Sequence, residues 1–165
     1  MTARFYNSPK QSITIFTDGS CHAQLKTGGW ASIIMMDSNK IVLQGTTLET
    51  THQRMELTAV LESLKYLERN GRIQQEIAIY SDSQYVVDLL KRKEGLLQSN
   101  YRTKKSKAVR NTDLVKELID FMNLPNIQFV KIRSHQKLSD PESRLNREVD
   151  VLSRKNMRSL LNEGV

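Results

Sequence analysis

The sequence predicts one α/β domain built on a five-stranded mixed sheet, with three antiparallel strands followed by two parallel strands and with flanking helices. Its 165 residues suit a single hydrophobic core, and 38% hydrophobic residues with only three prolines argue against a disordered or fibrous chain. The first third of the chain holds apolar runs separated by turn-forming residues. Beyond it, segments with helical spacing alternate with short apolar runs, as is typical of an α/β fold.

The first three strands are expected to form an antiparallel meander. The apolar runs are 12–17, 30–36 and 41–48. The first ends at the turn-forming pair Asp18-Gly19, Gly28-Gly29 introduces the second, and Asp37-Ser38-Asn39 separates the second from the third. In this interpretation Asp18 lies at the carboxyl end of the first strand.

The middle of the chain is predicted to contain a helix, a buried strand and a second helix. Leu57, Val60, Leu61, Leu64 and Leu67 recur at helical spacing within 51–70, and the pair after them, Asn70-Gly71, is a stop signal. Glu56 falls in the early turns of this helix. The apolar run 76–80 then leads through Asp82 into a segment with helical spacing.

The last third begins with a basic stretch, 91–110, which reads as a protrusion or loop because its apolar residues keep no long period. A helix over 113–122, capped by Asn111 or Thr112, is expected to precede a strand over 127–132. A polar loop with His135 follows. We expect a terminal helix to start near Leu145 or Asn146, with Asp150 about one turn inside it.

Four carboxylates stand out because the chain has a formal net charge of +7 and a pI near 9.6. They are Asp18, Glu56, Asp82 and Asp150. Acids gathered on a basic body are consistent with divalent cations held against a polyanion such as a nucleic acid. In open α/β sheets, sites form beyond the carboxyl ends of strands, which is where Asp18 and Asp82 are expected to converge.

Each of these residues also has a purely structural interpretation. Asp18 with Gly19 could be only a turn, and Asp82 could be a helix N-cap. Glu56 and Asp150 near helix starts could be solvated acids that favour the helix dipole. His135 alone could be a surface residue. A shared site is favoured by their combination, because the two strands that lead to Asp18 and Asp82 would be adjacent and two helix starts would pack near their ends.

Several blocks of residues carry a resemblance to a known family. They are Thr17-Asp18-Gly19-Ser20, Gly28-Gly29-Trp30-Ala31, Thr50-Thr51-His52-Gln53-Arg54-Met55-Glu56-Leu57, Asp82-Ser83-Gln84-Tyr85-Val86, Val109-Arg110-Asn111-Thr112-Asp113-Leu114, and Ser134-His135 followed by Asn146 and Asp150. In order and spacing they resemble the ribonuclease H type 1 family, in its cellular form with a basic protrusion. The resemblance implies a ribonuclease H-like fold and one domain over 1–165, with a core at about 12–158.

The family resemblance also implies a chemistry. Asp18, Glu56, Asp82 and Asp150 match the residues that ligate two Mg²⁺ ions, or Mn²⁺ ions, near the scissile phosphate. His135 matches a histidine that assists proton transfer or product release. The implied activity is endonucleolytic hydrolysis of the RNA strand of an RNA/DNA hybrid, leaving 5′-phosphate and 3′-hydroxyl ends.

Substrate contacts follow from the same resemblance. Gln53, His52 and Gln84 are implied to face the minor groove of the hybrid, and Thr51 and Asn111 to hold a DNA-strand phosphate. The basic stretch is expected to neutralise backbone phosphates, with a solvated charged loop as the alternative. The cations expected to do so are Lys91, Arg92, Lys93, Arg102, Lys104, Lys105 and Lys107.

The chain departs from the family pattern at several positions. The protrusion lacks tryptophan, since Trp30 is the single Trp of the chain. Glu49 stands where many relatives carry a basic residue, and its charge should repel a phosphate. Gln24 and Leu25 replace a common Asn-Pro pair, and the stretch from His135 to Asp150 is longer than in many relatives.

The remaining expectations concern location and partners. The single cysteine, Cys21, forms no internal disulfide, no apolar run could span a bilayer, and the start of the chain lacks a signal-peptide pattern. We therefore expect a cytoplasmic protein without membrane contact, and a monomer. Three alternatives to a hybrid-cutting enzyme stay open here: a nucleic-acid-binding module, a domain of a polymerase-linked protein, and a nuclease for DNA junctions or single strands.

Overall fold

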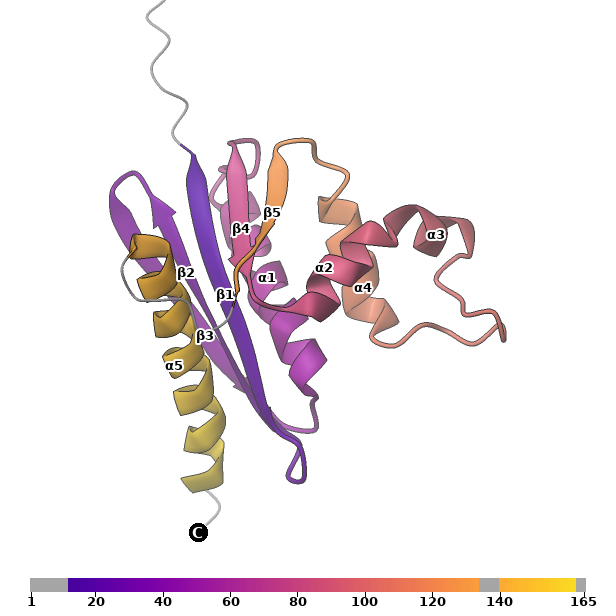
Figure 1. The fold of residues 1–165 in the computed structure, drawn as a ribbon, viewed down its shortest axis with the longest axis horizontal. Coiled ribbons are helices and arrows are strands. Elements are labelled where there is room, and N and C mark those ends of the chain that lie inside the picture. The colour runs from indigo at the N-terminus through magenta and orange to yellow at the C-terminus, as the bar shows by residue number, and fades with distance from the viewer. Residues whose placement is uncertain (1–11, 134–139, 163–165) are drawn as a thin grey trace, which may run out of the picture.

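The computed structural model describes residues 12–133 and 140–162 (Figure 1). Within them, one mixed sheet has the strand order β3-β2-β1-β4-β5. The strands are β1 (Ile13–His22), β2 (Thr27–Met36), β3 (Asn39–Thr47), β4 (Ile77–Ser81) and β5 (Ile127–Lys131). β1 pairs antiparallel with β2 and β2 with β3, whereas β1 with β4 and β4 with β5 are parallel. The predicted fold class is confirmed.

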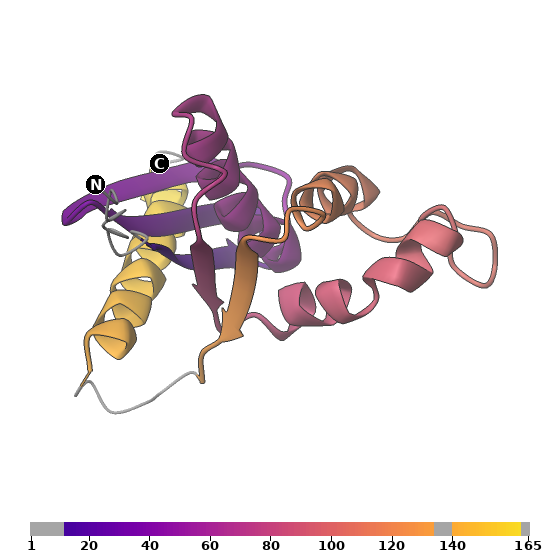
Figure 2. The same cartoon turned by 90° about the horizontal axis from the view of Figure 1, so that it is seen from above.

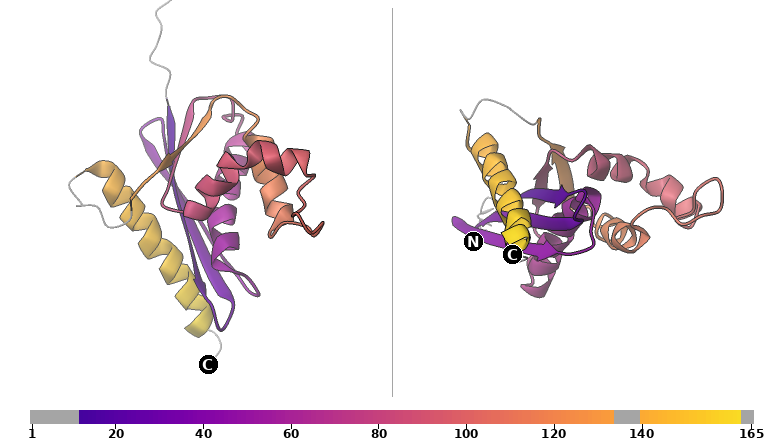
Figure 3. Two further views of the ribbon diagram at one scale, coloured as in Figure 1. Left: turned by 45° about the vertical axis from the view of Figure 1, so that its right-hand side comes forward. Right: turned by 90° about the horizontal axis from the view of Figure 1, so that it is seen from below.

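Helices cover both faces of the sheet. They are α1 (His52–Arg69), α2 (Gln84–Lys91), α3 (Lys93–Gln98), α4 (Thr112–Phe121) and α5 (Pro141–Asn162). α1 packs on one face against β1 and β2, with α4 beside it, and α5 crosses the other face (Figure 3). None of the helices in the described ranges is long and apolar enough to cross a bilayer.

The alternation of side chains along β1 creates two separate cores. Ile15 belongs to the core under α1, and its neighbour Phe16 belongs to the core under α5. Two residues further on, Asp18 shares the α5 face with Phe16, and Gly19 faces α1. The strand period therefore directs the first candidate carboxylate toward α5.

The predicted turn at Asp18-Gly19 is wrong, and Gly28-Gly29, expected just before the second strand, belongs to that strand. Asp18-Gly19 and Gly28-Gly29 lie inside β1 and β2, and the chain reverses at residues 23–26 instead. These glycines are needed for close packing: a Cβ on Gly19 would lie 2.3 Å from the backbone nitrogen of Glu56, and one on Gly29 would lie 2.3 Å from that of Met157. Glycine marks here the approach of a helix to the sheet and not a reversal of the chain.

The terminal helix begins earlier than predicted. α5 starts at Pro141, so Asp150 lies about two and a half turns inside the helix and not one. Asp140 caps this end, since its Oδ1 accepts a hydrogen bond of 2.7 Å from the Ser143 backbone nitrogen and its Oδ2 one of 2.9 Å from the Ser143 hydroxyl. The Asp-Pro pair was the overlooked signal, because Asp is a favoured N-cap and Pro a favoured first helical residue.

The basic stretch, residues 91–110 and hereafter the basic segment, is only partly a loop. Residues 93–98 form the short helix α3, and the chain then extends away from the sheet as an irregular loop before α4 (Figure 2). Leu96 and Tyr101 are buried, and both belong to the core under α1. These two anchors attach the basic segment to the domain.

Candidate active site

The candidate site lies at the carboxyl ends of the neighbouring parallel strands β1 and β4. The last paired residues of β1 and β4 are Phe16 and Tyr80, whose rings stack with centroids 4.9 Å apart. Asp18 and Asp82 each lie two residues beyond that pair, so the register carries them to the same level of the sheet. The predicted convergence of these two acids at one sheet edge is in agreement with the register.

Glu56 reaches the same edge from the second turn of α1, beside Gly19 of β1. Its side chain is 9% exposed, and both carboxylate oxygens have protein partners. The Ser83 hydroxyl donates a 2.5 Å hydrogen bond to Oε2, and His52 Nε2 lies 2.9 Å from Oε1. Ser83 also caps α2 by accepting from the Val86 backbone nitrogen at 3.2 Å. Ser83, and not Asp82, is therefore the N-cap of α2.

α5 supplies the fourth acid and a partner for the first. The Ser153 hydroxyl donates a hydrogen bond to Asp18 Oδ2. Arg154 Nε donates to Asp150 Oδ1 at 2.8 Å, one helical turn away. Ser153 is fully buried, and sequence reasoning had not identified either residue, because a serine and an arginine on a helix carry no signal of their own.

Burial and mutual repulsion change the acidity of the site. The pKa of Asp18 is raised to about 7, chiefly by burial; the Ser153 hydrogen bond lowers it in part, and the charges of Asp82 and Asp150 add to the rise. The pKa of Asp82 is also raised, first by burial and then by Glu56 and Asp150. Because the charges of neighbouring acids contribute to both shifts, these carboxylates lie close enough to repel one another.

The donor set suits a hard divalent cation, since Mg²⁺ prefers carboxylate oxygens. Across the described ranges, however, no three His, Cys, Asp or Glu side chains already form a metal-binding group. Glu56, Asp18 and Asp150 are instead turned to Ser83, Ser153 and Arg154. The hydrogen bonds of Asp18 and Asp150 use one oxygen of each carboxylate, Oδ2 and Oδ1 respectively.

A second network fixes Asn111, the residue predicted to cap α4. It is the N-cap by position, but its φ is 56° and its side chain makes no cap hydrogen bond. Its Nδ2 donates to the Tyr85 hydroxyl at 3.0 Å, and its Oδ1 accepts from Arg54 Nη1 at 3.5 Å. Arg54 in turn makes two hydrogen bonds, of 3.0 and 2.7 Å, to Asp113. The Asn111 side chain is thereby held between α1 and α2.

Known proteins are similar to this chain in sequence and in fold. The family model for RNase H matches residues 10–158. The chain belongs to the ribonuclease H family. A ribonuclease H of Syntrophomonas wolfei is 32% identical over 152 residues, which cover 91% of this chain and 99% of that protein. The ribonuclease H of Caldicellulosiruptor saccharolyticus is 35% identical over 127 residues, 76% of this chain and 85% of the relative.

Solved structures of ribonucleases H have the same fold. LC9-RNase H1, described as a type 1 RNase H with the type 2 active-site motif, superposes with a TM-score of 0.74 at 19% identity, covering 93% of this chain and 75% of that one. LC11-RNase H1 in complex with an RNA/DNA hybrid gives a TM-score of 0.64 at 21% identity, covering 90% and 99%. At these identities the comparison establishes the ribonuclease H fold.

The residues predicted to face the minor groove of the hybrid differ in their freedom. His52 is engaged with Glu56, and its pKa is raised by that hydrogen bond. The Gln84 amide donates to Asp88 Oδ1 at 2.7 Å and accepts from Lys131 Nζ. Lys131 is the last residue of β5 and was not among the predicted site residues. Gln53 is half-buried at the start of α1. His135 lies outside the described residues.

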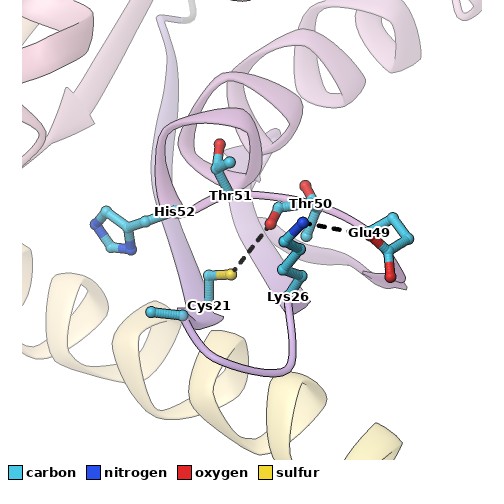
Figure 4. Close-up of a pocket in the computed structure, with 7 residues that line it drawn as sticks. Cys21, Lys26, Glu49, Thr50, Thr51 and His52 are labelled. Carbon is cyan, nitrogen blue, oxygen red and sulfur yellow. Dashed lines mark hydrogen bonds and ion pairs between the residues drawn. The ribbon is translucent and has the colours of Figure 1, made fainter.

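Thr51 begins α1 and borders a pocket of about 330 Å³. Its hydroxyl accepts from the Arg54 backbone nitrogen at 3.3 Å. The pocket is lined by Cys21, Ala23, Lys26, Glu49, Thr50, Thr51 and His52 (Figure 4). Lys26 had not been predicted to take part in a site, because a lysine in a turn is ordinarily a solvated residue.

The cations of the basic segment divide into tied and free ones. Lys93 Nζ donates to the Met122 carbonyl at 2.9 Å, and Arg102 Nη1 donates to the Ser106 carbonyl at 2.8 Å. The other cations that were predicted to neutralise phosphates are exposed: Lys91, Arg92, Lys104, Lys105 and Lys107. The role of these cations in binding stays a prediction. Lys93 also joins the basic segment to the end of α4 through its bond to Met122.

Proposed function

We propose that this member of the ribonuclease H family is an endonuclease that hydrolyses the RNA strand of RNA/DNA hybrids. The observation that carries the proposal is the approach of four acids to one sheet edge from β1, α1, the β4–α2 connection and α5. Support comes from the family and from a similar structure, LC11-RNase H1, which was solved in complex with an RNA/DNA hybrid. The excess of Lys and Arg over acids, 25 against 18, suits a polyanionic substrate.

Asp18, Glu56, Asp82 and Asp150 would hold two Mg²⁺ ions, with Mn²⁺ as an alternative. Ions bound there supply an activated water and offset the charge that develops on the leaving oxygen, which yields 5′-phosphate and 3′-hydroxyl ends. The basis for this assignment is the donor set, together with pKa values of Asp18 and Asp82 that are raised first by burial and then by the charges of neighbouring acids.

The protein's own residues prepare the site. Ser83 and Ser153 hold Glu56 and Asp18 by hydrogen bonds from buried hydroxyls, so each acid keeps a defined orientation. Arg154 offsets the charge of Asp150. His135, from the segment outside the described residues, is proposed to move protons or to assist product release, a role that suits the imidazole pKa.

Substrate selection is assigned to groups around the acids. Gln53, with His52 and Gln84, would contact the minor groove, where the 2′-hydroxyl distinguishes RNA from DNA. Thr51 and Asn111 would hold a phosphate of the DNA strand. The exposed cations of the basic segment would neutralise further phosphates, so binding should weaken with added salt. We also propose a monomer in the cytoplasm, for which gel filtration and cell fractionation are the tests.

The deciding experiment is cleavage of an end-labelled RNA/DNA hybrid with Mg²⁺, Mn²⁺ or EDTA, beside duplex RNA, duplex DNA and single strands. We expect metal-dependent cutting confined to the RNA strand of the hybrid. Binding of the hybrid without cutting in either metal would indicate a binding module. Cutting of DNA would assign the chain to another nuclease activity on the same fold.

A further inference from the structure

The pocket beside α1 contains a pair of opposite charges that the catalytic residues do not use. Lys26 Nζ lies 3.8 Å from Glu49 Oε2, and both side chains line the pocket that Thr51 borders (Figure 4). His52 connects this pocket to the carboxylates, since it lines the pocket and contacts Glu56. The pocket is thus next to the active site but chemically distinct from it.

Backbone contacts hold the two charged residues opposite each other. The Thr50 backbone nitrogen donates to the Lys26 carbonyl at 2.9 Å, and the Cys21 thiol donates to the Thr50 carbonyl at 3.6 Å. These bonds attach the β1–β2 turn to the segment that enters α1. Lys26 and Glu49 both have positive φ, 51° and 50°, which is uncommon for residues other than glycine. The facing of the two side chains is therefore built into the backbone.

The ion pair itself is weak enough to be exchanged. The Lys26 and Glu49 side chains are 63% and 81% exposed. Exposed pairs of that kind are weak, so a phosphate that offers Lys26 a second anion can replace Glu49 as its partner. Lys26 is the lysine of the pocket lining, and Glu49 is the acid that it faces.

We propose that Lys26 and Thr51 bind one backbone phosphate of the hybrid's DNA strand in this pocket, and that Glu49 competes with that phosphate for Lys26. The inference rests on the proposed function for the nature of the ligand. It accounts for a feature that simple repulsion does not: the negative charge at Glu49 is matched by a lysine placed directly against it. Glu49 then lowers hybrid affinity through Lys26.

The test is a double-mutant cycle on hybrid binding, measured by fluorescence anisotropy in EDTA so that no cleavage intervenes. We expect Glu49→Gln to tighten binding about two- to fivefold, because Lys26 is released. Lys26→Ala should weaken binding about three- to tenfold and reduce the slope of log K against log salt by about one. In the Lys26→Ala background, most of the gain from Glu49→Gln should disappear.

A second exposed Lys–Glu pair is a matched control. Lys40 Nζ lies 2.6 Å from Glu148 Oε1, and Lys40 pairs with Met35 at the opposite end of β3 from the pocket. Lys40→Ala and Glu148→Gln make the same charge changes, and we expect them to leave hybrid affinity within about twofold of the wild type. Equal effects of the two pairs would overturn the proposal, because the whole-protein charge would then explain both.

A set of hybrids with a single methylphosphonate at successive positions identifies the phosphate. We expect one DNA-strand position at which the neutral substitution removes the advantage of Glu49→Gln. An unchanged gain from Glu49→Gln in the Lys26→Ala background would overturn the competition, and a sensitive position on the RNA strand would overturn the strand assignment. Hybrid cleavage by wild type in Mg²⁺ separates these failures from failure of the proposed function.

Discussion

The carboxylates are held by hydrogen bonds between distant parts of the sequence, whereas the exposed tip of the basic segment is held by a local one. Asp18 receives its hydrogen bond from Ser153, 135 positions away in the sequence, and Glu56 receives one from Ser83, 27 positions away. In the basic segment, Arg102 bonds to Ser106 four residues on, and Leu96 and Tyr101 supply the core contacts. The acids, whose chemistry needs fixed atoms, thus lie at the packed carboxyl ends of the central strands. The cations, which only have to follow a phosphate backbone, lie on an exposed extension.

The largest effect expected from this difference is at the sheet edge. Asp82→Asn should lower hybrid cleavage on the order of a thousandfold or more, because it removes a charged metal ligand, while hybrid binding persists. Single-turnover cleavage in Mg²⁺ and anisotropy in EDTA measure the two quantities. Asp120→Asn, an exposed acid of α4, is the control that should cut normally. Full activity of Asp82→Asn would refute the assignment of the site.

The anchor of the basic segment can be tested with two adjacent leucines. Leu96 is 3% exposed and Leu97 is 46% exposed. Leu96→Ala should lower the free energy of unfolding by about 2–4 kcal/mol, because it leaves a cavity in the core under α1. Leu97→Ala should change it by less than about 0.5 kcal/mol. Urea unfolding gives both values, and equal values would mean that the segment is not anchored through Leu96.

The burial of Asp18 should appear in the pH dependence of stability without metal. Its folded-state pKa of about 7 lies above the usual aspartate value of 3.8, so the protonated acid favours the folded state. That contribution is complete below about pH 4 and is lost as the pH rises through 7. Asp18→Asn should therefore stabilise the metal-free protein at pH 8 by about 1–3 kcal/mol, and the gain should vanish in acid.

Thermal or urea unfolding in EDTA across this pH range measures the Asp18→Asn effect. The asparagine can still accept the hydrogen bond from Ser153, so the comparison isolates the charge. A gain that is the same at pH 4 and pH 8 would contradict a buried, proton-binding Asp18.

The smallest effect is expected from the free cations. Lys104→Ala with Lys105→Ala should weaken hybrid binding about three- to tenfold at low salt and less at high salt, since only phosphate attraction is lost. The single-turnover rate at saturating enzyme should stay unchanged. Lys155→Ala with Arg158→Ala on α5, across the sheet from the basic segment (Figure 1), is the matched control. A large loss of rate would place these lysines nearer to the chemistry than proposed.

Much of the fold could be predicted because its signals are local. The helical period of leucines identified α1, the β-branched runs identified β1 and β5, and turn residues separated β2 from β3. The wrong predictions came from residues whose role depends on distant neighbours. Asp18-Gly19 was interpreted as a turn and Gly28-Gly29 as the lead-in to a strand, although the backbones of α1 and α5 lie against Gly19 and Gly29. The start of α5 was misplaced because the cap at Asp140 was overlooked.

The sequence by itself determined the order of the elements and the positions of Asp18, Glu56, Asp82 and Asp150 at or near their ends, since periodicity and turn chemistry act over a few residues. Tertiary structure alone decided which partners those acids have. The raised pKa of Asp18, the Ser83 and Ser153 hydrogen bonds, the Asn111 network and the facing of Lys26 and Glu49 all depend on distances between atoms that the sheet and the helices bring together. Electrostatic and hydrogen-bond energies fall off with distance in space and not with separation in the chain, so they are fixed only when the chain has folded.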